Sequence, residues 1–205
     1  MLKTIKTIFA AGVVLSAASM APVAAQQAGA GANMGSLTEF LPGYVEEGVW
    51  RKGIVDGAFR VENSTDGNAS TWYSAPLRES EAGRRVVSLD VRIQEGDPDL
   101  SHAGLLYGYV EGRDLRYFFT IETGKVSLFE IGGGAANAMM VTETDAVVDG
   151  WNTLKIVEEG RMVTLEVNGH NIGGIGNDSM GQGAVGIVAW GTGSFEFRNF
   201  ETSVN

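Results

Sequence analysis

Apolar and polar residues alternate with a period of two along most of this chain. In the segment 85–94, Val87, Leu89, Val91 and Ile93 would share one face of a strand, and the residue after each of them is polar or charged. The same alternation recurs in 162–167 and 195–198. A period of two is typical of a half-buried β-strand, and one polar face is typical of antiparallel sheets.

Turn-forming residues separate these segments at short intervals, as in 122–125, 158–161 and the pair Asn168-Gly169, which is a strong hairpin signal. Glycine-rich stretches at 132–134 and 173–183 are interpreted as a flexible turn and a mobile loop. Many short strands with turns between them predict an all-β protein, a two-sheet antiparallel β-sandwich. We expect strands near residues 54–62, 70–74, 85–94, 103–111, 115–122, 125–131, 138–142, 151–158, 161–168, 184–190 and 194–203.

The N-terminus has the pattern of a secretory signal peptide. Lys3 and Lys6 precede an apolar run from 8 to 18, and small residues at 23–25 follow it. We predict a signal peptide over 1–25, a flexible tether over 26–36 and one β-sandwich domain over 37–205. The protein is therefore expected to be exported, to the periplasm or the extracellular space. The apolar run is shorter than the ~20 residues that a membrane span needs, so no membrane insertion is predicted.

Composition narrows the possible partners. The chain has no cysteine, which excludes disulfides and thiolate metal sites. Without the signal peptide, 13 basic residues face 25 acidic ones, a formal charge of −12. Nucleic acid is a poor candidate because its binding depends on clustered Lys and Arg. A neutral ligand, a cation or another protein remains open, and the oligomeric state is not defined.

Three short motifs follow one another in the second half of the chain: Trp-Asn-Thr-Leu-Lys-Ile at 151–156, Val-Asn-Gly at 167–169 and Phe-Glu-Phe-Arg-Asn-Phe at 195–200. In this order they resemble the concanavalin A-like lectin/glucanase superfamily, and within it the 3-keto-disaccharide hydrolase-like domains and the laminin-G-like jelly rolls. The resemblance covers roughly 48–203 and implies a jelly roll of two antiparallel sheets. In this superfamily, ligands usually bind on the concave sheet face or at the loop rim.

Aromatic residues are the candidate ligand-binding groups, because flat rings stack on the apolar faces of sugars. Trp151, Tyr117, Phe119, Phe195 and Phe197 are assigned to the core. The predicted ligand-binding residues are aromatic residues not assigned to the core, together with one arginine on the strand beside the Tyr107/Tyr109 strand. They are Trp72, Tyr107, Tyr109, Arg116 and Trp190. Tyr107 and Tyr109 are placed on one face of a strand, and the alternative is that both simply pack between the sheets.

No catalytic residue, metal site or cofactor is predicted. The alternating carboxylates of the retaining glucanases are absent, and Asp56, Asp90 and Glu122 are the candidates if the protein is a hydrolase. Calcium is possible at the oxygen-rich loops 63–68 and 95–99, although such clusters are more often ordinary turns. His102 and His170 are given plain strand-edge or turn roles.

The sequence thus favours an exported, non-catalytic binding domain that recognises carbohydrate or another envelope component through a concave sheet face. Two alternatives remain open. One is a glycoside hydrolase or lyase of the 3-keto-disaccharide hydrolase-like type, and the other is a structural or adhesion protein with a protein partner.

Overall fold

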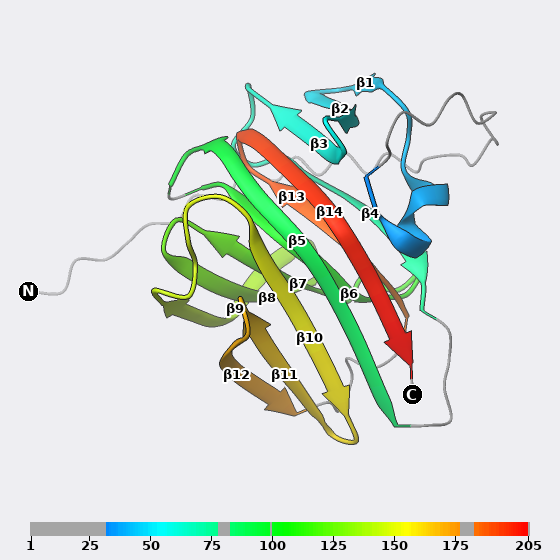
Figure 1. Cartoon of the computed structure of the whole chain (residues 1–205), viewed down its shortest axis with the longest axis vertical. Coiled ribbons are helices and arrows are strands. Elements are labelled where there is room, and N and C mark those ends of the chain that lie inside the picture. Colours follow the sequence, from blue (N-terminus) through cyan, green and yellow to red (C-terminus); the bar gives the residue numbers. More distant parts are fainter. Residues whose placement is uncertain (1–31, 78–82, 99, 177–182, 205) are drawn as a thin grey trace, which may run out of the picture.

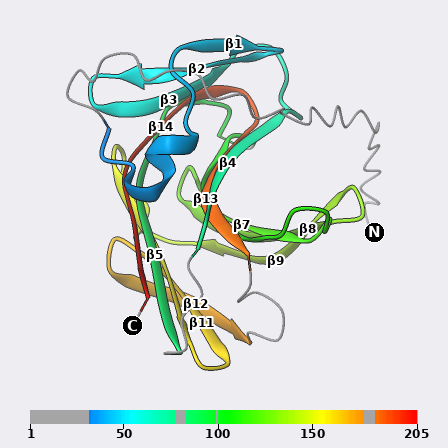
Figure 2. The ribbon, with the colours of Figure 1, turned by 90° about the vertical axis from the view of Figure 1, so that its right-hand side faces the viewer.

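The computed structural model describes residues 32–77, 83–98, 100–176 and 183–204. These residues form two antiparallel sheets that pack face to face (Figures 1 and 2), which confirms the predicted two-sheet sandwich. Sheet A has the order β1 (Val45–Glu47), β2 (Trp50–Val55), β3 (Ala58–Asn63), β14 (Gly193–Val204), β5 (Arg84–Gly96), β10 (Asn152–Glu159), β11 (Met162–Val167), β12 (His170–Gly176). Sheet B has the order β4 (Ser70–Pro76), β13 (Ala184–Trp190), β6 (His102–Tyr109), β7 (Arg116–Glu122), β8 (Lys125–Gly132), β9 (Ala135–Glu143).

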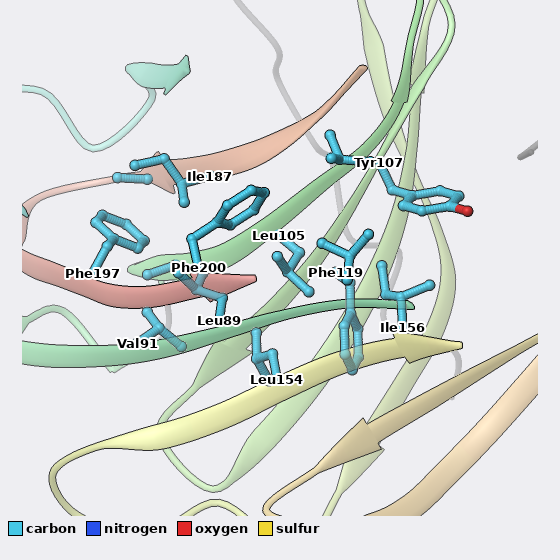
Figure 3. Close-up of a cluster of buried hydrophobic side chains, with 14 of the residues drawn as sticks. Leu89, Val91, Leu105, Tyr107, Phe119, Leu154, Ile156, Ile187, Phe197 and Phe200 are labelled. Atoms are coloured by element: carbon cyan, nitrogen blue, oxygen red, sulfur yellow. The ribbon is translucent and has the colours of Figure 1, made fainter. Parts of the chain in front are cut away.

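The main core lies between the sheets and follows directly from the alternation in the sequence. Along most of the strands every second residue points inward, and the predicted core residues Tyr117, Phe119, Phe195 and Phe197 are all part of the core. Figure 3 shows side chains of both sheets interdigitating: Leu89, Val91, Leu154, Ile156, Phe197 and Phe200 from sheet A with Leu105, Phe119 and Ile187 from sheet B.

Two hairpins differ from the sequence-based strands. The strand predicted over 54–62 is in fact β2 and β3, joined by a turn at Asp56 (φ 50°) and Gly57 (φ 76°). Asp-Gly favours this kind of turn because both central residues need positive φ. The hairpin at Asn168-Gly169 is confirmed, but β12 follows it where a mobile loop was expected from residue 173. Residues 177–182 of that predicted loop lie outside the described residues.

The domain begins earlier than predicted. Ala32 and Met34 are buried, and the backbone N–H of Phe200 donates to the carbonyl of Asn33 (3.0 Å). A 3₁₀-helix, η1 (Gly35–Phe40), follows and contributes the buried Leu37. Residues 32–36 therefore pack on the sandwich instead of forming the end of a tether. The predicted signal peptide and tether residues 26–31 lie outside the described residues.

None of the helical segments in the described residues has the length and apolar character needed to cross a membrane.

A β-bulge in β6 separates the two tyrosines that were predicted to share a face. Leu106 pairs with Gly186 and Tyr109 pairs with Ala184, so Tyr107 and Gly108 together lie opposite the single residue Val185. Gly108 adopts φ 70°, which favours glycine, and the extra residue reverses the side-chain alternation. Tyr107 continues the inward pattern of Ala103 and Leu105, with 2% exposure (Figure 3), whereas Tyr109 after the bulge points outward.

The buried hydroxyl of Tyr107 is satisfied by a carboxylate from the opposite sheet. It donates to Glu158 Oε2, and Arg85 Nη2 donates to the other oxygen, Oε1 (2.6 Å). Glu158 is 5% exposed, so its carboxylate is buried at the edge of the core. Both of its oxygens accept a hydrogen bond, which offsets the cost of this burial.

We expect Tyr107→Phe to lower the free energy of unfolding by about 1–3 kcal/mol, because it removes the hydroxyl partner of a buried carboxylate. Tyr109→Phe is the matched control, with an expected change within about 0.5 kcal/mol since Tyr109 lies on the outer face. Urea unfolding of both variants measures the difference. Equal losses of unfolding free energy in Tyr107→Phe and Tyr109→Phe would contradict the placement of Tyr107 in the core and Tyr109 on the outer face.

Candidate functional site: the outer face of sheet B

The outer face of sheet B carries a second apolar cluster, separate from the core. Its centre is formed by Leu106, Phe118 and Val188, which are 0–2% exposed. Four partly exposed side chains pack around this centre: Trp72, Tyr109, Phe129 and Ile131. In Figure 2 the sheet bends, with β7, β8 and β9 turning away from β4 and β13, and this face lies on the inside of the bend.

Side-chain contacts across the face agree with this bend. Arg116 of β7 lies 4.5 Å from the ring centroid of Trp72, although β13 and β6 lie between their strands. The ring centroids of Phe129 (β8) and Trp190 (β13) are 5.5 Å apart across two intervening strands. Three strand spacings amount to ~14 Å in a flat sheet, so such contacts need side chains that converge on the inside of a curve.

An aromatic group forms one end of the face. The ring of His102 lies 5.1 Å from that of Trp190 and 5.4 Å from that of Phe129, the latter edge-on. Trp190 and Phe129 remain partly exposed, whereas His102 is 8% exposed. The arrangement offers a ring surface at which an apolar sugar face can stack.

A carboxylate lies directly beside these rings. Glu122 Oε1 is 3.3 Å from His102 Nδ1 and accepts a hydrogen bond from Ser127 Oγ (2.5 Å). Burial by itself raises the pKa of Glu122, but the nearby His102 ring and the Ser127 hydroxyl outweigh it, so the net pKa is lowered from its usual value. Glu122 is therefore an ionised acceptor at neutral pH.

Arg116 forms the opposite end of the face. Its guanidinium stacks over Trp72 and lies 5.8 Å from the ring of Phe118. Arg116 Nε and, between the two ends, Thr120 Oγ1 are buried and find no hydrogen-bond partner among the described residues. Unsatisfied buried polar atoms are uncommon in folded proteins, and ligand sites are one place where they occur.

Four of the five predicted ligand-binding residues thus share one face: Trp72, Tyr109, Arg116 and Trp190. Tyr107 does not, because of the bulge. Sequence reasoning missed Phe129 and Thr120 and gave His102 and Glu122 other roles. The alternation of β7 could have found part of this set, since Phe118, Thr120 and Glu122 follow Arg116 at every second position.

Trp151 was assigned to the core, and this is wrong. It lies partly exposed on the outside of sheet A, with the guanidinium groups of Arg198 and Arg92 at 3.9 and 4.7 Å from its ring centroid. The reason is the alternation itself. Leu154 and Ile156 point inward, so position 151 falls on the opposite face.

The candidate carboxylates for hydrolysis are not brought together. Asp56 lies in the β2–β3 turn, Glu122 lies on sheet B, and Asp90 lies on the outer face of sheet A, in β5. Asp90 there accepts hydrogen bonds from Thr153 Oγ1 (2.6 Å) and Asn199 Nδ2 (2.8 Å). These three residues therefore do not form the acid and nucleophile pair of a glycosidase.

The oxygen-rich loop 63–68 is built from turns. Asn63 Oδ1 accepts from the backbone N–H groups of Thr65 (3.0 Å) and Asp66 (3.2 Å), and Asp66 Oδ1 accepts from that of Asn68 (2.8 Å). These are Asx turns, in which the side-chain oxygens already have donors. Across the described parts of the chain, no group of three or more His, Asp or Glu side chains is arranged to hold a metal ion. Asp99 of the second loop lies outside the described residues.

Comparison with known proteins gives matches in structure only. No protein-family model and no curated protein sequence matches the chain. The fold is similar to the carbohydrate-binding module CBM66 from Bacillus subtilis, with a TM-score of 0.53, 18% identity, and coverage of 77% of this chain and 92% of that one. It is also similar to a protein of unknown function with a galectin-like fold from Bacillus subtilis, with a TM-score of 0.51, 15% identity, and coverage of 76% and 86%. A third similar structure is the GH43 protein BlXynB from Bacillus licheniformis, with a TM-score of 0.51 and 16% identity.

The match to BlXynB covers 77% of this chain but only 37% of that protein. The chain has a galectin-like, concanavalin A-like β-sandwich fold, and of the resemblance in its sequence the concanavalin A-like fold is confirmed. At these identities the likeness defines the fold and not the activity.

We expect Glu122→Gln to destabilise the protein most near neutral pH. The folded-state pKa of this carboxyl is lowered below its usual value of 4.5. The stabilisation by its ionised form is thus present above that value and is lost as the pH falls through the folded-state pKa. Urea unfolding of wild type and variant between about pH 7 and about pH 3 measures the difference.

Glu111→Gln, an exposed position on the β6–β7 loop, controls for the loss of one surface carboxylate. A difference between wild type and Glu122→Gln that widens toward acid would mean that burial dominates, and it would contradict the assigned contacts.

Proposed function

We propose that this protein is an exported carbohydrate-binding domain whose ligand lies on the outer face of sheet B. One observation carries the proposal: partly exposed aromatic side chains from four strands, Trp72, Tyr109, Phe129 and Trp190, converge on the inside of a curved sheet. Their rings would stack on the apolar faces of sugar rings. Polar groups beside them, at Arg116 and Glu122, would fix the hydroxyls.

Further support comes from the fold and the N-terminus. One similar structure is named as a carbohydrate-binding module. The signal-peptide pattern at 1–25 supports action outside the cytoplasm, where polysaccharides are accessible.

The two alternatives have weaker support. Hydrolysis by a 3-keto-disaccharide hydrolase-like mechanism lacks a carboxylate pair among its three candidate residues, and turnover of disaccharides by the purified protein would establish it. A role in binding another protein predicts self-association or partner capture that sugars do not affect.

We expect Trp72→Ala and Trp190→Ala each to weaken glycan binding by at least about tenfold, because each removes a stacking ring. The ligand is first found with a thermal-shift screen of sugars and envelope polysaccharides, since a ligand that binds only the folded state raises the melting temperature. Titration calorimetry then measures the affinity of each variant.

Trp151→Ala is the matched control, because it removes a partly exposed tryptophan from the outside of sheet A. Its affinity should equal that of wild type. Unchanged binding in both Trp72→Ala and Trp190→Ala, or a loss in Trp151→Ala alone, would move the site away from sheet B. If no sugar or polysaccharide in the screen raises the melting temperature, the result would contradict carbohydrate binding.

A further inference from the structure

Arg116 stands apart from most basic side chains of the protein by its lack of a counter-ion. Eight other arginines and lysines of the described residues lie within 4.0 Å of a carboxylate: Arg51, Lys52, Arg60, Arg84, Arg85, Arg92, Lys155 and Arg198. Arg116 has no acidic group of the described residues within that distance. Asp114 is the nearby acidic residue that acts on it, and only at longer range.

This unpaired charge lies in a partly dry environment. The guanidinium packs against the rings of Trp72 and Phe118, and Nε is buried without a hydrogen-bond partner. Burial lowers the pKa of Arg116 from its usual value, which reflects the cost of holding a cation away from water. An arginine remains protonated nevertheless, so within the described part of the chain this charge has no carboxylate to balance it.

We propose that the glycan recognised on the outer face of sheet B contains an acidic sugar, and that Arg116 pairs with its carboxylate while Trp72 stacks on its ring. This inference rests on the proposed function. The planar guanidinium matches the two oxygens of a carboxylate, and a partly desolvated pair of this kind is stronger than one in open water.

The rest of the face predicts that the acidic sugar is isolated among neutral ones. Glu122 lies six residues from Arg116 along β7, which corresponds to roughly 20 Å in an extended strand. That end carries an ionised carboxylate beside His102, so it repels a second acid and accepts hydrogen bonds from hydroxyls. Because the Debye length at physiological salt is about 8 Å, Glu122 and the net charge of −10 do not cancel the attraction at Arg116.

The test compares matched glycans that differ only in whether their carboxyl groups are free or methyl-esterified: sialyllactose, a glucuronic acid-substituted xylo-oligosaccharide and an oligogalacturonate, each with its own methyl ester. The protein is purified after expression of the full chain, and affinities are measured by calorimetry. We expect the acidic member of at least one pair to bind at least about tenfold tighter, and this preference to shrink as salt is added.

Arg116→Gln should reduce the ratio of acidic to neutral affinity to about one. Arg113→Gln, at an exposed position on the β6–β7 loop just before β7, makes the same change in net charge and should keep the ratio. Arg116→Lys keeps the charge without the planar fork and should give an intermediate ratio, which also tests the site if Arg116→Gln disturbs the packing on Trp72.

Two results would overturn the inference and leave the proposed function intact. One is binding of neutral and acidic members with equal affinity, with both sensitive to Trp72→Ala. The other is an acid preference that persists in Arg116→Gln. Failure of every glycan to bind would overturn the proposed function and this inference together.

Discussion

The two-sided apolar character of sheet B is the constraint on which the rest of the structure depends. Its inner face, including Leu105 and Phe119, packs against sheet A, and its outer face carries a separate buried cluster around Leu106 and Phe118. An outer face normally meets water, so these side chains are buried only because the bend lets their neighbours cover them. The curvature that shields the cluster also brings residues of distant strands, such as Trp72 and Arg116, into contact.

Much of the fold could be predicted because the period-two pattern is a local property of the sequence. Strands such as β5 and β7 were found nearly to the residue, since alternation and flanking turns mark their ends. The errors arose where a local turn signal was overlooked, or where tertiary packing determined whether a residue is buried. Asp56-Gly57 carried an ordinary hairpin signal, whereas the burial of Met34 depends on the sandwich against which it packs.

The candidate site could be predicted only in part, because its membership depends on register. Trp72 and Trp190 were found as aromatic residues outside the obvious core pattern. Tyr107 and Tyr109 were expected on one face, but the extra residue Gly108 reverses the alternation after Tyr107, so only Tyr109 reaches the outer face. The contacts of Trp190 with Phe129 and His102 could not be foreseen, since they join β13 to two other strands of a curved sheet.

The outer faces of both sheets carry a tryptophan packed against arginine, but the arginine charges are balanced differently on the two faces. Outside sheet A, Trp151 is flanked by Arg92 and Arg198, but Arg92 is bound to the buried Glu196 and Arg198 lies 3.6 Å from Asp90. The positive charges there are compensated by carboxylates within the protein. On sheet B, Arg116 lies over Trp72, and none of the described carboxylates lies within ion-pair distance of it. A cation held against an aromatic ring and left without an internal anion stabilises the fold less than a compensated one, and the difference becomes available to a ligand that supplies the missing charge.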